Sequence, residues 1–101
     1  MMAEWVLVLE QAAVDLENGR DFYEKQLPGL GDYFTDSLIA DIESLQLSAG
    51  IHAIHYGAHR MLAKRFPFAI YYNLKDGTAC VIAVLDVRRD PTWLHGQMKN
   101  R

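Results

Sequence analysis

Cysteine, proline and, in the first half of the chain, positive charge are all scarce in this 101-residue sequence. The single cysteine, Cys80, cannot form a disulfide within the chain, so a reducing cytoplasm is the expected location. The amino-terminal residues have neither the basic flank nor the long apolar core of a signal peptide or membrane span, so we predict neither, and no membrane partner. Half of the residues are apolar and 23% are charged, which is typical of one globular domain over residues 1–101.

Charge is unevenly distributed along the chain. Residues 1–50 hold two cations against ten acids, a net charge of −8, whereas residues 51–101 hold eight cations against three acids, a net charge of +5. A local basic surface attracts a polyanion or an acidic partner even when the whole protein is acidic. The basic half also holds all four histidines, but His52, His55 and His59 lack acidic or thiolate companions at ligand spacing. We therefore expect no metal site, and nothing in the sequence predicts a cofactor.

The first half of the chain predicts one strand and two helices. Residues 5–9 form a continuous apolar run of strand length, which is typical of a strand covered on both faces. Apolar residues then recur at helical spacing from Gln11 to Leu27, and Pro28-Gly29 ends that helix. A second helix is predicted from Gly31 or Asp32 to Leu47, with an apolar stripe formed by Phe34, Leu38, Ile42 and Leu45. Because their connection is short, the two helices are expected to run antiparallel.

The second half predicts four antiparallel strands, over residues 51–56, 60–64, 68–74 and 78–87. The sequence Lys75-Asp76-Gly77 predicts a tight hairpin turn between the last two, because both turn residues tolerate positive φ. Residues from His95 onward are predicted to be frayed or shaped by a partner. The fold class is therefore α+β: an N-terminal strand, an antiparallel two-helix hairpin and a four-stranded antiparallel curved sheet.

Two basic pairs flank the last hairpin of this sheet. Lys64-Arg65 precedes its first strand and Arg88-Arg89 follows its second. The first and last residues of an antiparallel hairpin lie close together, so four cations gather at the end of the sheet away from the turn. We interpret this cluster, together with Arg60 on the preceding strand, as an anion- or partner-binding site. Trp93 is added to the site because tryptophan often anchors protein interfaces.

Several motifs, in this order and spacing, resemble the RelE/ParE superfamily of toxins from type II toxin–antitoxin systems, formerly called plasmid stabilisation proteins. The motifs are Ala13–Leu16 with Phe22-Tyr23, the junction Pro28–Gly31, His59-Arg60, Lys64–Tyr72 and Val84–Pro91. The resemblance covers nearly the whole chain. It implies the fold described above, a bacterial cytoplasmic location and neutralisation by a cognate antitoxin, for which we expect an acidic amphipathic segment that folds onto the basic half.

The resemblance leaves the target open. ParE-like members block DNA gyrase, which requires a rigid surface with a basic patch and apolar anchors, and no proton transfer. RelE-like members cleave messenger RNA in the ribosomal A site, where lysines and arginines stabilise the developing phosphorane and other groups move protons. A third alternative is a degenerate, non-toxic binding module.

For RNA cleavage, the resemblance implies a role for Lys64 or Arg65 and for Arg88 or Arg89. The family's C-terminal tyrosine is replaced by Trp93, whose indole cannot act as a general acid. A histidine would have to take its place, and the residues available are His55, His59 and His95. Of these, His95 lies nearest the tyrosine's position in the sequence. Because of this substitution, the ParE-like alternative is favoured.

Overall fold

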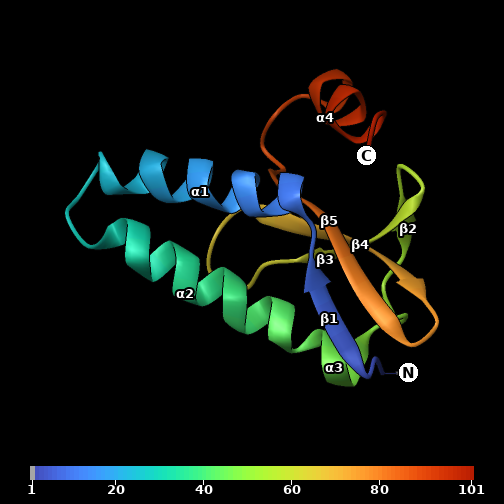
Figure 1. Ribbon diagram of the computed structural model, residues 1–101. Helices are drawn as coiled ribbons and strands as arrows, with labels where there is room; N and C mark the ends of the chain where they lie inside the picture. Colours follow the sequence, from blue (N-terminus) through green and yellow to red (C-terminus); the bar gives the residue numbers. More distant parts are fainter. Residues whose placement is uncertain (1) are drawn as a thin grey trace.

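The computed structural model describes residues 2–101 and shows a five-stranded sheet with helices against both of its faces (Figure 1). The elements follow the order β1 (Trp5–Val8), α1 (Glu10–Glu24), α2 (Leu30–Glu43), α3 (Leu45–Ser48), β2 (Ile54–His55), β3 (Ala58–Leu62), β4 (Phe68–Lys75), β5 (Thr78–Asp86) and α4 (Pro91–Met98). The strands lie side by side in the order β1-β5-β4-β3-β2. β1 pairs with β5 in parallel, and the other neighbours pair antiparallel. The α+β prediction, with four antiparallel strands after the helical hairpin, is confirmed.

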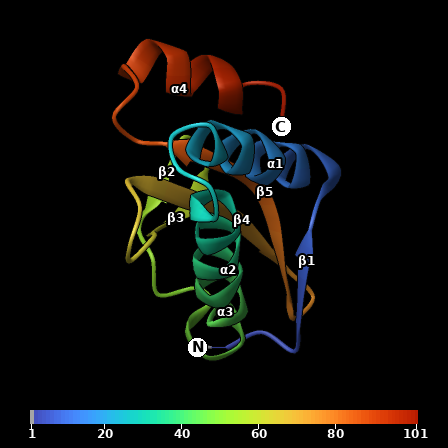
Figure 2. The same cartoon turned by 90° about the vertical axis from the view of Figure 1, so that its left-hand side faces the viewer.

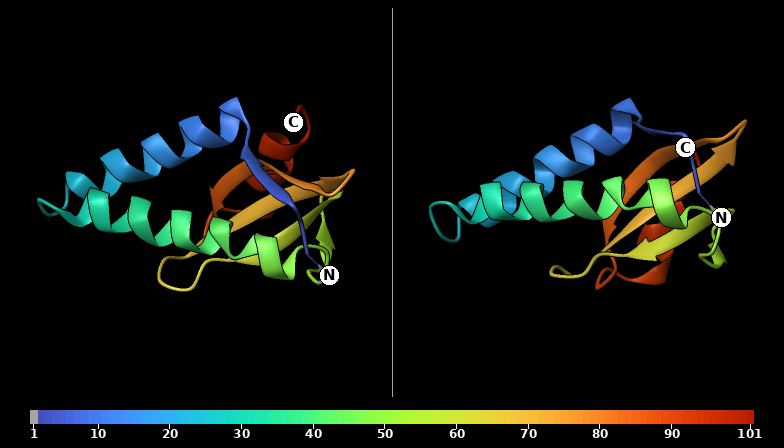
Figure 3. Two further views of the ribbon diagram at one scale, coloured as in Figure 1. Left: turned by 60° about the horizontal axis from the view of Figure 1, so that its bottom comes forward. Right: turned by 90° about the horizontal axis from the view of Figure 1, so that it is seen from below.

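The helical hairpin forms because the chain between α1 and α2 is shaped for a sharp reversal. Gly29 has a φ of +90°, a conformation that residues with a Cβ seldom adopt. The Glu24 carboxylate accepts hydrogen bonds from the backbone N–H groups of Gly29 and Gly31, which begin α2. A Cβ atom at position 31 would lie 2.7 Å from the carbonyl oxygen of Arg20, so glycine is what lets the helices approach. The hairpin extends beyond the end of the sheet (Figure 3).

Aromatic side chains fill the space between this hairpin and the sheet. Tyr23 of α1 stacks on Phe34 of α2 with 5.2 Å between ring centroids, and Phe34 meets Phe68 of β4 edge-on at 4.9 Å. The predicted apolar stripe of the second helix is buried throughout, at Phe34, Leu38, Ile42 and Leu45. The helix breaks at Ser44, whose hydroxyl donates a hydrogen bond to the carbonyl oxygen of Asp41, so the predicted end at Leu47 falls in the separate turn α3.

The opposite face of the sheet is covered by α4, which the sequence did not predict. Leu94 and Met98 of this helix are buried against Tyr71 of β4 and Leu85 of β5. The Asp90 side chain accepts a hydrogen bond from the backbone N–H of Trp93 at 3.0 Å and so caps the start of the helix. The expectation of a frayed tail is therefore wrong. Figure 2 shows α4 lying across the molecule next to α1.

The apolar run at residues 5–9 is an edge strand and not a covered one. Trp5 is 66% exposed and Leu7 is 53% exposed. The prediction of a strand buried on both faces is wrong, because Val6 packs against the core whereas Trp5 and Leu7, which point to the opposite face of the strand, are exposed. The apolar run therefore predicts the strand correctly but does not predict that one face of it is exposed.

The hairpin of β4 and β5 has the predicted turn. Asp76 and Gly77 both have positive φ, +50° and +75°, as a two-residue turn of the primed type requires. The pairing that follows places Phe68 opposite Asp86 at the far end of the hairpin. This register places the loop before β4 and the segment after β5 at the same end of the sheet.

Candidate functional site

The two basic pairs lie at the same end of the sheet, as the hairpin geometry predicts. The backbone N–H of Val87 donates to the carbonyl oxygen of Pro67 at 3.0 Å, which joins the segment after β5 to the loop between β3 and β4. That loop carries Lys64 and Arg65, and the segment after β5 carries Arg88 and Arg89. All four cationic residues are exposed. We call them the sheet-end cations.

Arg88 is fixed by its neighbour in the sequence. Its Nε and Nη2 donate to the two carboxylate oxygens of Asp86 at 3.1 and 2.7 Å, and its backbone N–H donates to the same carboxylate at 2.8 Å. Burial alone would raise the pKa of Asp86, but the hydrogen bonds and charge of Arg88 outweigh burial, so the pKa lies below its ordinary value. Asp86 therefore stays ionised near neutral pH and offsets much of the charge of Arg88.

Arg89 is the more available of the two arginines. Its guanidinium carbon lies 3.8 Å from the centre of the Trp93 ring, which is a cation–π arrangement. Within residues 2–101, no carboxylate lies at salt-bridge distance from it. The stacking orients the guanidinium without neutralising it, so Arg89 can bind an incoming anionic group at little cost in side-chain ordering.

Arg60 and His95 lie apart from the sheet-end cations, in a second cluster. Arg60 of β3 pairs with Tyr71 of β4, and His95 of α4 stacks on Tyr56 with 5.9 Å between ring centroids and 18° between planes. The Tyr56 and Tyr71 rings are 6.3 Å apart, so the two tyrosines link Arg60 to His95. Tyr56 was not predicted as a site residue. The sequence marks it only by its place before Gly57 in a turn, where the φ of Tyr56 is +54°.

Tyr71 is buried at the centre of this second cluster. Its hydroxyl has no hydrogen-bond partner of good geometry among the described residues. Burial raises the pKa of Tyr71, and the nearby Arg60 guanidinium offsets part of the rise. The hydroxyl is therefore protonated near neutral pH and lies out of reach of a macromolecule while α4 is in place.

His52 and His59 have structural contacts on the other face of the sheet. Tyr72 is fully buried, and its hydroxyl accepts a hydrogen bond from the backbone N–H of Gly50 at 2.9 Å and lies 2.5 Å from Nδ1 of His52. The His59 ring stacks on Tyr72, and its Nδ1 donates to the carbonyl oxygen of His52 at 2.7 Å. These contacts anchor the segment before β2, so His59 is occupied as a packing residue.

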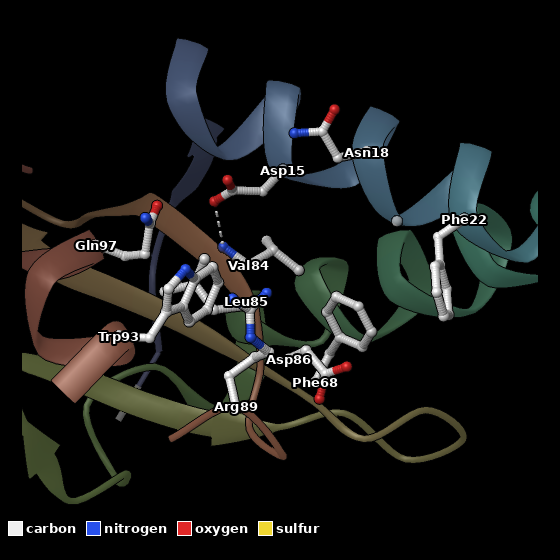
Figure 4. A pocket seen from close by; sticks show the side chains of 11 residues that line it. Asp15, Asn18, Phe22, Phe68, Val84, Leu85, Asp86, Arg89, Trp93 and Gln97 are labelled. Carbon is white, nitrogen blue, oxygen red and sulfur yellow. Dashed lines mark hydrogen bonds between the residues drawn. The ribbon is translucent and has the colours of Figure 1, made fainter. Parts of the chain in front are cut away.

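A groove of about 440 Å³ runs between α1, the end of β5 and α4 (Figure 4). Phe68 and Val84 form its floor, Phe22 and Asn18 line the wall formed by α1, and the wall formed by α4 presents Trp93 and Gln97. We call it the α1–α4 groove. Arg89 and Asp86 also line it, so the groove is continuous with the sheet-end cations. The groove was not predicted, because Phe22 and Trp93 lie far apart in the sequence and the packing of α4 leaves no periodic pattern in it.

No protein-family model and no curated protein matches this chain. A solved structure does: it is described as the chromosomal ParDE TA system from P. aeruginosa, and one of its chains matches with a TM-score of 0.74. The match covers 82% of this chain and 95% of that chain, at 18% sequence identity. At this identity the likeness shows a shared fold, and it confirms the RelE/ParE-like fold expected from the sequence. Over residues 2–101, no helix is both long and apolar enough to cross a membrane.

Proposed function

We propose that this chain is the toxin of a type II toxin–antitoxin pair, that it inhibits DNA gyrase in the manner of ParE-like toxins, and that a cognate antitoxin neutralises it. The observation that carries the proposal is the shared fold with a chain of a ParDE system, matched over 95% of that chain. The sheet-end cations, Lys64, Arg65, Arg88 and Arg89, together with Trp93, supply the rigid basic surface with an apolar anchor that this mode of action requires.

The contacts of these cations favour binding over bond cleavage. RNA cleavage requires a proton-transferring group beside the cations that stabilise the phosphorane. Trp93 and His95 are two residues apart on α4, so their side chains leave the helix about 200° apart. Trp93 meets Arg89, whereas His95 meets Tyr56. The histidine expected to replace the family's tyrosine is thus directed away from the sheet-end cations.

An mRNA endoribonuclease remains the second candidate function, and the cluster of Arg60, Tyr71, Tyr56 and His95 is the observation that favours it. This cluster combines a cation with a histidine, whose ring nitrogens can donate or accept a proton. Its Tyr71 is buried beneath α4, so cleavage there would require the helix to move.

Inducing the chain alone in a growing bacterium, with parallel pulse labelling of DNA and protein synthesis, distinguishes these functions. We expect DNA synthesis and plasmid supercoiling to fail first while translation continues. The Arg88→Ala/Arg89→Ala double variant is expected to lose this effect, and Lys75→Ala, an exposed cation at the opposite end of the hairpin, is the matched control. Early arrest of translation with messages cut in the A site would instead favour the endoribonuclease. Normal growth with the wild-type chain would indicate a non-toxic binding module.

A further inference from the structure

We propose that the free edge of β1 is a self-association surface, at which two copies of this chain pair their β1 strands antiparallel about a two-fold axis at Leu7. The two sheets then form one continuous sheet. Figure 2 shows β1 at the margin of the molecule. The proposal goes beyond the proposed function and does not rest on it, because it follows from the backbone and side-chain pattern of β1.

The outer edge of β1 offers backbone groups for such a pairing. The backbone N–H groups of Trp5 and Leu9 donate to carbonyl oxygens of the β4–β5 turn and of β5, at 3.4 and 2.9 Å. Backbone groups alternate in direction along a strand, so those of Val6 and Val8 point away from β5. Among residues 2–101 no strand lies on that side of β1. These groups are a ready template for a further strand.

The side chains of β1 are complementary to a second copy of themselves. Pairing about Leu7 lets Val6 exchange both N–H···O bonds with Val8 of the second copy. It also places Leu7 opposite Leu7, and Trp5 opposite Leu9, as non-hydrogen-bonded pairs, in which side chains lie closest. Trp5, Leu7 and Leu9 share one face of the strand and are 66%, 53% and 42% exposed. The pairing therefore removes an exposed apolar strip of each copy from water.

The two edges of the sheet differ in a way that limits the assembly to a dimer. Residues 5–9 contain neither a charged residue nor a proline, the features that keep edge strands apart. The opposite edge strand, β2, has only two residues, which makes it a poor template. Pairing through β1 uses the same edge of both copies, so it closes and leaves only the short β2 edges outside.

The dimer is expected to be weak. A standard interface buries roughly 1,600 Å², which exceeds what two four-residue strands with this apolar strip provide. At each end, the exposed Glu4 of one copy also meets the exposed Glu10 of the other, and like charges placed opposite each other are destabilising. We therefore expect a dissociation constant in the micromolar range. Trp5 pairs with Thr78 at the turn end of the hairpin, so the sheet-end cations of both copies stay exposed.

Sedimentation velocity over a concentration series tests the proposal, and we expect a monomer–dimer equilibrium for the wild-type chain. Leu7→Asp places two like charges on the two-fold axis and should raise the dissociation constant by about tenfold or more. The matched control is Leu62→Asp on β3, where the leucine is 56% exposed, and it should change the constant by less than about twofold. Circular dichroism at a concentration where the wild type is monomeric verifies that both variants fold.

Reversing one charge at the end of the paired strands should strengthen the dimer. Glu4→Lys replaces the repulsion with Glu10 of the second copy by an attraction at both ends, so the dissociation constant should fall by about threefold or more. Glu17→Lys, at an exposed acid of α1, makes the same change in net charge away from the strand and should alter it by less than about twofold.

Disulfide cross-linking tests the register, in a Cys80→Ala background that removes the natural thiol. Leu7→Cys should form a disulfide between copies on mild oxidation, because Cα atoms of a non-hydrogen-bonded pair lie about 4.5 Å apart, within the range that a disulfide spans. Leu62→Cys should not. A wild-type chain that stays monomeric at millimolar concentration, a dimer insensitive to Leu7→Asp, or a dimer that Leu7→Cys fails to cross-link would overturn the proposal.

Discussion

At the scale of single residues, Asp15 shows how one carboxylate connects three distant parts of the chain. It accepts a hydrogen bond from the backbone N–H of Val84 at 2.9 Å and forms a two-point ion pair with Arg101. Both side chains of the ion pair are nearly buried, with 11% and 9% of their surface exposed. From the sequence, Asp15 was one of many acids on a solvated helix face. Nothing local to it indicates that residue 101 returns to meet it.

Removing one partner of this ion pair leaves a buried charge without compensation. We therefore expect Arg101→Ala to lower the free energy of unfolding by about 3 kcal/mol in urea titrations. Lys99→Ala, a nearby cation that is exposed, should change it by less than about 0.5 kcal/mol. Equal stabilities of the two variants would show that the tail does not dock on α1.

The histidine next to Tyr72 predicts a pH dependence of stability. Burial, and secondarily the neighbouring His59, lower the pKa of His52 below its usual 6.5. The unfolded chain then binds a proton more readily than the folded one, so stability is greatest above pH 6.5 and falls as the pH drops from there through the folded pKa. His52→Asn should flatten this part of the curve of unfolding free energy against pH. An unaltered slope in His52→Asn would contradict this assignment.

At the scale of elements, glycine stabilises the fold at one position, Gly77, and weakens it at another, Gly96. Gly77 has a φ of +75° in the β4–β5 turn, where an L-residue with a Cβ is strained. Gly96 lies inside α4, and a Cβ there would meet no atom within 4 Å.

We therefore expect Gly77→Ala to reduce the free energy of unfolding by about 1 kcal/mol, and Gly96→Ala to increase it by about 0.5–1 kcal/mol through helix propensity. Chemical denaturation of the two variants measures both values. A loss of stability on Gly96→Ala would mean that α4 is not helical at that position.

The elements that were predictable are those with a local signal. Three features have a signal that lies within a short stretch of sequence, and the structure contains all of them. They are the turn at Asp76-Gly77, the helix end at Pro28-Gly29 and the apolar stripe of the second helix. Burial of the two faces of β1 depends on what packs above and below the sheet, which its own residues do not indicate, and α4 contains only eight residues with a weak apolar pattern. The sheet-end cations could be predicted because hairpin pairing forces their proximity. The α1–α4 groove could not, because it exists only when α4 packs beside α1.

At the scale of the whole molecule, the charge asymmetry of the sequence becomes an asymmetry in space. The acidic first half, with a net charge of −8, forms β1 and the helical hairpin, while the basic second half, with +5, forms the rest of the sheet and α4. The hairpin extends away from the sheet (Figure 3). An acidic partner is repelled by the hairpin and attracted to the sheet-end cations. Blocking this surface would silence the toxin that we propose.

The most direct test of this account is DNA supercoiling by purified gyrase in the presence of the purified protein. We predict that the wild-type chain and Lys75→Ala inhibit supercoiling and that Arg88→Ala/Arg89→Ala does not, because the double variant loses the cationic surface after β5. Full supercoiling activity in the presence of excess wild-type protein would contradict the central claim that this chain is a gyrase inhibitor.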